Sequence, residues 1–322
     1  LYLIARTRWM KRWGPSIRES IEFFEAAILE DEDFALAHAG LAQAHMLLPI
    51  FAVEPVDVHD EYGKARIAAR RALALDPNLS QAHAAMGFIA HAYDWDWAEA
   101  ERQYLRSIEL NPDDAETRGW YTDLLLILQR DEEASIQGAI AASLDPLSWN
   151  AIRASLFSSE GGGLREGERT LRRFLSMNPD HRSAQIGLSF ALLFDGRAIE
   201  AGEVAKAVWE AAGSRHSDSV PILLQAVGDP ESRDRAVRIV QLLKEEGPFS
   251  RSFAGFCLLL VGAHDEALEE AEYEVESRTW GATQIGGSLW APLSSNPRYQ
   301  ALLDEVGIPG PQGVERGDLI GR

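Results

Sequence analysis

Residues 100–134 read AERQYLRSIELNPDDAETRGWYTDLLLILQRDEEA, and this stretch is one copy of a pattern that recurs along the chain. Each copy carries a small residue at its start, and the copies follow one another at nearly constant spacing. These small residues are Ala65, Ala100, Ala134, Gly167 and Ala201. A proline follows each of the first four after twelve residues, at Pro77, Pro112, Pro146 and Pro179. Such a repeat, of about 34 residues, is typical of an array of helical hairpins.

Three of these prolines end nearly identical phrases, Leu-Asp-Pro at 75–77 and 144–146 and Leu-Asn-Pro at 110–112. Two small residues and the proline of each copy resemble the framework of the tetratricopeptide repeat (TPR) family. The matching sets are Ala65, Ala72 and Pro77; Ala100, Ser107 and Pro112; and Ala134, Ala141 and Pro146. The match is good over about residues 1–213 and looser over about 220–277, and it departs from the family at Phe174 and Val208, which are bulky. The resemblance implies a right-handed superhelical solenoid whose concave groove binds proteins or peptides.

We therefore expect an all-α solenoid of about eight helical hairpins with a capping helix near the C-terminus. Residues 1–214 are predicted to form regular repeats, and residues 215–306 to form degenerate hairpins and the capping helix. Residues 307–322 are rich in glycine and proline and are predicted to form a flexible tail. The step from Ser20 to Ala65 is longer than the regular repeat, which indicates an insertion around residues 48–54. Insertions in repeat proteins map to loops on one face and are often functional.

A narrower resemblance links residues 20–42, 94–98 and 295–299 to a repeat module of large bacterial signalling proteins. In that group the module usually lies C-terminal to an adenylate cyclase, a protein kinase or a winged-helix DNA-binding domain. The chain starts at Leu1, already inside a helical pattern and without a methionine. We therefore expect it to be part of a longer protein or a processed chain.

The composition is that of a globular protein with a strongly acidic balance. The chain is 46% hydrophobic and 25% charged, with a formal net charge of −19. This charge argues against nucleic-acid and anionic-membrane partners, which need a cationic surface. The basic segment 6–18, with Trp9 and Trp13, leaves such a contact open beside a solvated face or a docking surface. The single cysteine, Cys257, and the lack of a secretory or membrane-spanning segment favour a cytoplasmic location.

No catalytic or cofactor motif is present in the sequence, so we expect a non-enzymatic protein without a cofactor. Histidines are the one group that invites a metal hypothesis. His38 and His45 are seven residues apart on a predicted helix, and His83 occupies the same repeat position as His38. A metal site needs three or four converging ligands. In repeats of this family these positions often belong to the core, so we expect no metal site.

The concave groove is the expected functional surface. The first helix of each hairpin lines the concave side of such an array, and positions two, five, nine, twelve and thirteen of each repeat should face it. The candidate groove residues are Leu36, Gln43, Met46, Asp123, Ile127, Asn150, Arg153, Phe157, Phe190 and Phe194. This mixture of apolar and polar side chains suits an extended or helical peptide. Ala39 and Gln43 stand where chaperone-binding relatives carry a Lys/Asn clamp, which disfavours a chaperone tail as partner.

The sequence thus favours a non-catalytic protein–protein interaction scaffold, part of a larger bacterial signalling or regulatory protein. Two alternatives remain open. The insertion at 48–54 and the Trp95/Trp97 corner suggest a ligand-sensing module that controls an attached cyclase, kinase or DNA-binding domain. Apolar groove or end surfaces suggest a self-association module that forms homo-oligomers.

Overall fold

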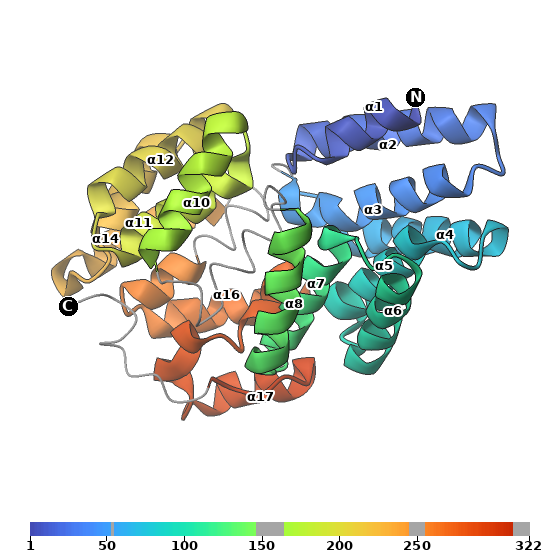
Figure 1. Cartoon of the computed structure of the whole chain (residues 1–322). Coiled ribbons are helices and arrows are strands. Elements are labelled where there is room, and N and C mark those ends of the chain that lie inside the picture. Colours follow the sequence, from blue (N-terminus) through green and yellow to red (C-terminus); the bar gives the residue numbers. More distant parts are fainter. Residues whose placement is uncertain (53–54, 146–163, 245–254, 312–322) are drawn as a thin grey trace. The chain divides into compact units, whose positions relative to one another are not determined.

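The computed structural model describes residues 1–52, 55–145, 164–244 and 255–311, and all regular structure in these ranges is helical (Figure 1). By its internal contacts the chain divides into two compact units. Among the described residues, the first unit comprises 1–52, 56–145 and 278–280, and the second comprises Pro55, 164–244, 255–277 and 281–311. Every hairpin with both helices described therefore lies within one unit.

The first unit is a row of helical hairpins. The helices pair in order along the chain, α1 with α2, α3 with α4, α5 with α6, and α7 with α8. Their bounds are α1 (Tyr2–Trp9), α2 (Gly14–Glu30), α3 (Ala35–Phe51), α4 (Val58–Leu75), α5 (Ser80–Ile89), η1 (Ala90–Asp94), α6 (Trp97–Leu110), α7 (Ala115–Ile127) and α8 (Asp131–Leu144).

Small residues allow these helices to approach closely. The small residues of the repeat are buried here, namely Ala65, Ala100 and Ala134. A Cβ built on Gly40 of α3 would stand 2.3 Å from the Phe24 ring of α2. A Cβ on Gly87 of α5 would likewise stand 2.8 Å from the Tyr104 ring of α6. Because interiors are close-packed, both helix contacts depend on glycine.

A side chain at one repeat position closes each of four turns between hairpins. The fourth residue of the helix after the turn bonds to a backbone carbonyl six residues earlier, at 2.8 to 3.0 Å. The pairs are His38 with Glu32, His83 with Pro77, Arg118 with Pro112, and Gln185 with Pro179. Three of the acceptors are the closing prolines of the repeat, so each of these prolines also anchors the next helix.

A π-helical turn accounts for the longest regular step of the repeat. The step from Ala65 to Ala100 is one residue longer than the step from Ala100 to Ala134. Within the longer step, α5 continues into η1 (Ala90–Asp94), and a π-turn inserts one residue into a helix. Trp95 then ends the helix in the left-handed region, at φ 59°. The helix, and not the loop, absorbs the extra residue.

The later part of the chain, most of it in the second unit, contains shorter and less regular elements. Their bounds are α10 (Leu164–Met177), α11 (Arg182–Phe194), α12 (Ala198–Ala211), η2 (Ser217–Ser219), α13 (Val220–Gln225), η3 (Pro230–Ser232), α14 (Arg233–Leu243), the helical residues 255–260, α16 (His264–Glu276), η5 (Trp280–Gln284), η6 (Ser288–Leu293) and α17 (Pro297–Val306). The helices α11 and α12 pack as a hairpin, and α13 packs with α14.

The two bulky residues that depart from the repeat framework are buried in the second unit. Phe174 is buried at 4% exposure and meets the His181 ring edge-on, with centroids 5.0 Å apart. Val208 is 1% exposed. Cys257 is fully buried, and burial raises the pKa of its thiol. It is therefore a packing residue of the core.

The expected all-α solenoid of helical hairpins is confirmed, and the final helix is present as α17. Asn296 caps α17 by accepting a hydrogen bond from the Arg298 N–H, and Gly307 ends it at φ 72°. The division into two units does not test the expected boundaries at residues 214 and 306, which stay predictions. Of the expected tail 307–322, residues 312–322 lie outside the described residues. Among the helices of the described ranges, none is both long enough and apolar enough to cross a membrane.

Candidate functional site

The predicted groove residues of the first unit lie at different depths. Gln43 is 3% exposed, and its Oε1 accepts a hydrogen bond from Arg6 Nη1 at 3.0 Å. Met46 is fully buried in the hydrophobic core, and Asp123 is 4% exposed. The partly exposed residues of the set are Leu36 and Ile127. Leu36 and Ile127 thus keep solvent-accessible surface, whereas Gln43, Met46 and Asp123 are buried.

Two of the remaining predicted groove residues are aromatic and lie in the second unit. Phe190 and Phe194 on α11 are partly exposed, and their rings stack with centroids 6.3 Å apart. Phe256 meets the Phe190 ring edge-on at 4.8 Å. These three rings form an aromatic cluster in the second unit. The other predicted groove residues, Asn150, Arg153 and Phe157, lie outside the described residues.

The histidines have structural partners. His38 and His83 close turns, a role that Arg118 and Gln185 fill in other repeats. His45 lies 2.7 Å from Glu61 in a buried pair. Burial raises the pKa of Glu61, but His45 and then Lys64 together outweigh it, so the pKa is lowered overall. Across the described ranges, no three His, Cys, Asp or Glu side chains converge as a metal site would require.

Arg12 belongs to the basic segment 6–18 and is buried in the first unit, so it is not part of a solvated face. It is 4% exposed, with φ 48°, and its guanidinium lies 3.8 Å from the centre of the Trp9 ring. Its side chain pairs with Glu116 on α7. Burial, and then repulsion from Arg6, lower the pKa of Arg12. The pair ties the turn after the first hairpin helix to the fourth hairpin.

A salt-bridge network, here called the Arg130 network, joins the third and fourth hairpins of the first unit. Arg130 precedes α8, and its Nη1 donates to Glu101 Oε1 on α6 at 2.7 Å. Its Nε and Nη2 donate to both oxygens of Glu133, each at 2.7 Å. The hydrogen bonds with Glu133, and then with Glu101, raise the pKa of Arg130. The bidentate geometry is the strong form of this interaction.

The same network recurs two repeats later in the second unit and is here called the Arg197 network. Arg197 precedes α12, and its Nη1 donates to Glu168 Oε2 on α10 at 2.8 Å. Its Nε and Nη2 donate to both oxygens of Glu200, at 2.8 and 2.7 Å. Atom for atom, the guanidinium makes the contacts that Arg130 makes. Two repeats therefore share this network, whereas the repeat between them carries Ser135 at the position of Glu101 and Glu168. In both places the network joins the turn within a hairpin to the helix that precedes that hairpin.

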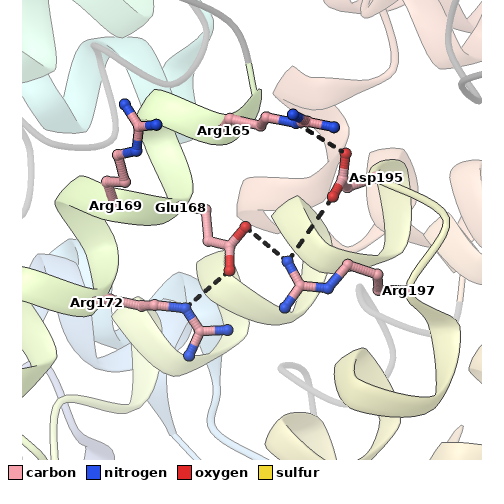
Figure 2. A pocket seen from close by; sticks show the side chains of 6 residues that line it. All are labelled: Arg165, Glu168, Arg169, Arg172, Asp195 and Arg197. Atoms are coloured by element: carbon pink, nitrogen blue, oxygen red, sulfur yellow. Dashed lines mark hydrogen bonds and ion pairs between the residues drawn. The ribbon is translucent and has the colours of Figure 1, made fainter.

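The Arg197 network lines a cavity of about 430 Å³ in the second unit, here called the arginine pocket. Its lining residues come from α10 and from the turn between α11 and α12, and they are Arg165, Glu168, Arg169, Arg172, Asp195 and Arg197. Figure 2 shows Glu168 between Arg172 and Arg197, and Asp195 between Arg165 and Arg197. Four guanidiniums and two carboxylates thus line one cavity.

The small-residue and proline pattern carries no sign of the arginine pocket, but the charged residues of the sequence do. Arg165, Arg169 and Arg172 are spaced four and three residues apart, which places them on one face of a helix. In addition, one constant offset relates Glu101, Arg130 and Glu133 to Glu168, Arg197 and Glu200, in that order. A comparison of charged positions between repeats shows both patterns, but it does not show that these residues line one cavity.

The fold is similar to solved structures, whereas no protein-family model and no curated protein matches the sequence. The human IFIT1 dimer with m7Gppp-AAAA has a TM-score of 0.55 at 12% identity, over 91% of this chain and 67% of that chain. PilF of Pseudomonas aeruginosa has a TM-score of 0.45 at 17% identity, over 76% of this chain and 98% of that chain. Yeast Tom70 has a TM-score of 0.46 at 15% identity, over 95% of this chain and 61% of that chain. At these identities the likeness is one of fold.

Proposed function

We propose that this chain is a non-catalytic protein–protein interaction scaffold of a larger bacterial signalling or regulatory protein in the cytoplasm. The observation that carries the proposal is the repetition of one hairpin framework, closed at four turns by equivalent side-chain bonds. Such an array presents equivalent positions at regular intervals, and repeat arrays of this kind offer extended binding surfaces. The resemblance of the small-residue and proline framework to the TPR family supports the same proposal.

The partner would be a peptide segment bound along the first helices of the hairpins. Among the predicted groove residues, Leu36, Ile127, Phe190 and Phe194 are partly exposed and are proposed to make the first contacts. The Phe190 and Phe194 pair offers a stacked aromatic surface on a rigid helix, which is the kind of anchor that dominates peptide binding. In the first unit, Gln43, Met46 and Asp123 would act mainly by shaping α3 and α7, the helices that carry Leu36 and Ile127.

Selection from a displayed library of random peptides, with the full chain as bait, tests this proposal. We expect enriched peptides that bind the chain one to one, and Phe190→Asp with Phe194→Asp should weaken those that bind the second unit by about tenfold or more. Ile199→Asp is the matched control, because Ile199 is an apolar residue 69% exposed on α12 outside the aromatic cluster. A failure to enrich any binding peptide would overturn the proposal.

Self-association is the second candidate, and one observation favours it. Helix α1 exposes Leu3 and Ile4, and Met10 follows it, with exposures of 77%, 46% and 62%. Adjacent exposed apolar side chains mark an interaction surface. If two copies pair there, light scattering gives a dimer mass that Leu3→Glu with Met10→Glu reduces to that of the monomer. A mass that is monomeric at every concentration excludes this candidate.

A further inference from the structure

A comparison of the Arg130 and Arg197 networks shows which arginines of the second unit are not needed for the bonds between helices. The offset that relates Arg130 to Arg197 also relates Ala98 to Arg165, and Leu105 to Arg172. The Arg130 network forms in the first unit with alanine and leucine at these positions. The bonds between hairpins therefore do not require guanidiniums at 165 and 172.

These two added guanidiniums are only partly engaged by the protein. The side chain of Arg165 is 82% exposed, and its Nε lies 3.9 Å from Asp195 Oδ1, beyond hydrogen-bond distance. Arg172 donates from Nε to Glu168 Oε1 at 2.8 Å, while its Nη2 stands 3.8 Å from Glu200. Both side chains line the arginine pocket (Figure 2). Their Nη groups are thus available to a ligand in the cavity.

We propose that the arginine pocket binds acidic groups, carboxylate or phosphoryl, on a peptide segment of the protein partner, with Arg165 and Arg172 as the binding residues. The inference rests on the proposed scaffold function and specifies the chemistry of its partner. A guanidinium offers a planar fork of donors that matches these oxyanions. In a chain with net charge −19, such a site is a local attraction that sets where an acidic segment can bind.

The spacing of the two arginines predicts the spacing of the acidic groups. Arg165 and Arg172 are seven residues apart on one helix, which separates their positions by about 10 Å. Two side chains three residues apart on a peptide in the polyproline II conformation lie on one face and are separated by about 9 Å. The pocket therefore favours a peptide with acidic groups at positions i and i+3.

The charges around the pocket favour a peptide over a nucleic acid. Glu168 and Asp195 line the same cavity, and Glu200 lies beside it. These carboxylates would repel the closely spaced phosphates of a nucleic-acid backbone, whereas two isolated acidic side chains can lie between them. The acidic balance of the whole chain acts in the same direction.

Fluorescence anisotropy with labelled glycine–serine peptides tests the proposal on the full chain. Three peptides carry glutamate, phosphoserine or serine at both of two positions three residues apart. We expect the two acidic peptides to bind at least about tenfold more tightly than the serine peptide, and Arg165→Gln with Arg172→Gln should remove this difference. Arg102→Gln is the matched control, because Arg102 on α6 is the equivalent of Arg169 and should leave binding unchanged.

The arms of the experiment distinguish the source of the anion and the class of ligand. Tighter binding of the phosphoserine peptide than the glutamate peptide identifies phosphoryl groups, and the reverse identifies carboxylates; either result supports the proposal. Displacement of the acidic peptide by equimolar inorganic phosphate would overturn it in favour of a free-anion site. Arg165-dependent binding of a single-stranded oligonucleotide more tightly than either acidic peptide would also overturn it.

Failure of this proposal is distinguishable from failure of the scaffold function. If acidic and serine peptides bind alike, or if Arg102→Gln weakens binding as much as the double variant does, the pocket is not an acidic-peptide site. Peptides enriched by display that bind the Arg165→Gln, Arg172→Gln variant unchanged would then still support the scaffold. If display enriches no peptide at all, the scaffold function itself falls.

Discussion

The Arg130 and Arg197 networks have the same arginine–glutamate bonds but differ in the residues around them. In the first unit, Glu101 accepts its second hydrogen bond from the Tyr121 hydroxyl, at 2.8 Å. In the second unit, Glu168 accepts the equivalent bond from Arg172. Both glutamates keep their bond to the arginine. The second donor is the neutral Tyr121 hydroxyl in the first unit and the Arg172 guanidinium, which lines the arginine pocket, in the second. The comparison teaches that the repeat keeps its connections and varies the residues around them.

A third ion pair joins consecutive hairpins of the first unit with the positions of the acidic and basic residues exchanged. Arg66 on α4 makes a bidentate pair with Asp94 at the end of η1, with bonds of 3.0 and 2.7 Å. The two residues are 28 apart, whereas Glu101 and Arg130 are 29 apart. The basic and acidic partners have exchanged places between consecutive hairpins. In the first unit, these consecutive hairpins are therefore joined by ion pairs of opposite polarity.

The largest effect is expected from glycines at close helix contacts, one in each unit. Gly40→Ala in the first unit places a Cβ 2.3 Å from the buried Phe24 ring, and Gly202→Ala in the second places one 2.8 Å from the Pro221 Cα. Each should lower the free energy of unfolding by about 1–3 kcal/mol, because the core is overpacked. Urea denaturation measures both. The Gly202 variant should lose more, since a backbone atom yields less readily than a ring.

Gly63→Ala is the control for these two variants. Gly63 lies in α4 with no atom within 4 Å of the position of its Cβ. The substitution should stabilise the protein by about 0.5–1 kcal/mol, because alanine is the better helix former. If Gly40→Ala were as stable as Gly63→Ala, the close contact of α2 with α3 would not hold the first unit together.

The next largest effect is expected when the two arginines that flank the Arg197 network are introduced beside the Arg130 network. Ala98→Arg with Leu105→Arg gives the Arg130 network the two cations that the Arg197 network has. Leu105 is 47% exposed and Ala98 is exposed, so neither change disturbs the core. We expect affinity for the acidic peptides to rise about tenfold in anisotropy measurements made in the Arg165→Gln, Arg172→Gln background. Ala98→Gln with Leu105→Gln, which adds polarity without charge, should produce no gain.

The small residues and the prolines were sufficient to predict the fold, because a helical hairpin array depends on close contacts that only small side chains allow. Ala65, Ala100 and Ala134 are all buried, as a packing role requires. The depth of the groove residues was not predictable in the same way. Met46 lies in the core, although its repeat position suggested the groove. The position of a residue in one repeat does not reveal how closely the neighbouring hairpins approach it.

The arginine pocket was missed for a different physical reason. Its six lining residues come from α10 and from the turn between α11 and α12, and no short motif contains them all. Arg197 appears as an ordinary surface cation until Glu168 is placed beside it, 29 residues earlier in the sequence. The sequence holds the information as a correlation between repeats. Detecting it requires knowledge of which positions of consecutive repeats come into contact.

A smaller effect is expected from breaking the networks themselves. Arg130→Gln and Arg197→Gln each remove one bidentate pair and one bridge to the preceding hairpin. The pairs are partly exposed, so each variant should lower Tm by only about 1–2 °C. Reversal of the charges, as Glu168→Arg with Arg197→Glu, should lower Tm further, because it sets a carboxylate beside Glu200 and a guanidinium beside Arg172. Differential scanning fluorimetry distinguishes these outcomes, and an unchanged Tm in both single variants would show that the networks do not stabilise the array.

The smallest expected effect is on the stability of the protein at acidic pH. Arg130 lowers the pKa of Glu133 below its ordinary value of 4.5, and Arg172 and then Arg197 lower the pKa of Glu168 despite partial burial. Arg197 likewise lowers the pKa of Glu200. Because these carboxylates bind protons less readily when folded, their stabilisation is complete above about pH 4.5 and is lost as pH falls through the folded values.

Arg197→Gln should therefore make Tm less dependent on pH below about 4.5 than it is in the unmodified chain. The decisive comparison is with Arg130→Gln, because two carboxylates depend on Arg197 but Arg172 still holds one of them. The two variants should consequently lose similar amounts of acid sensitivity, and a much larger loss in Arg197→Gln would mean that Arg172 does not pair with Glu168.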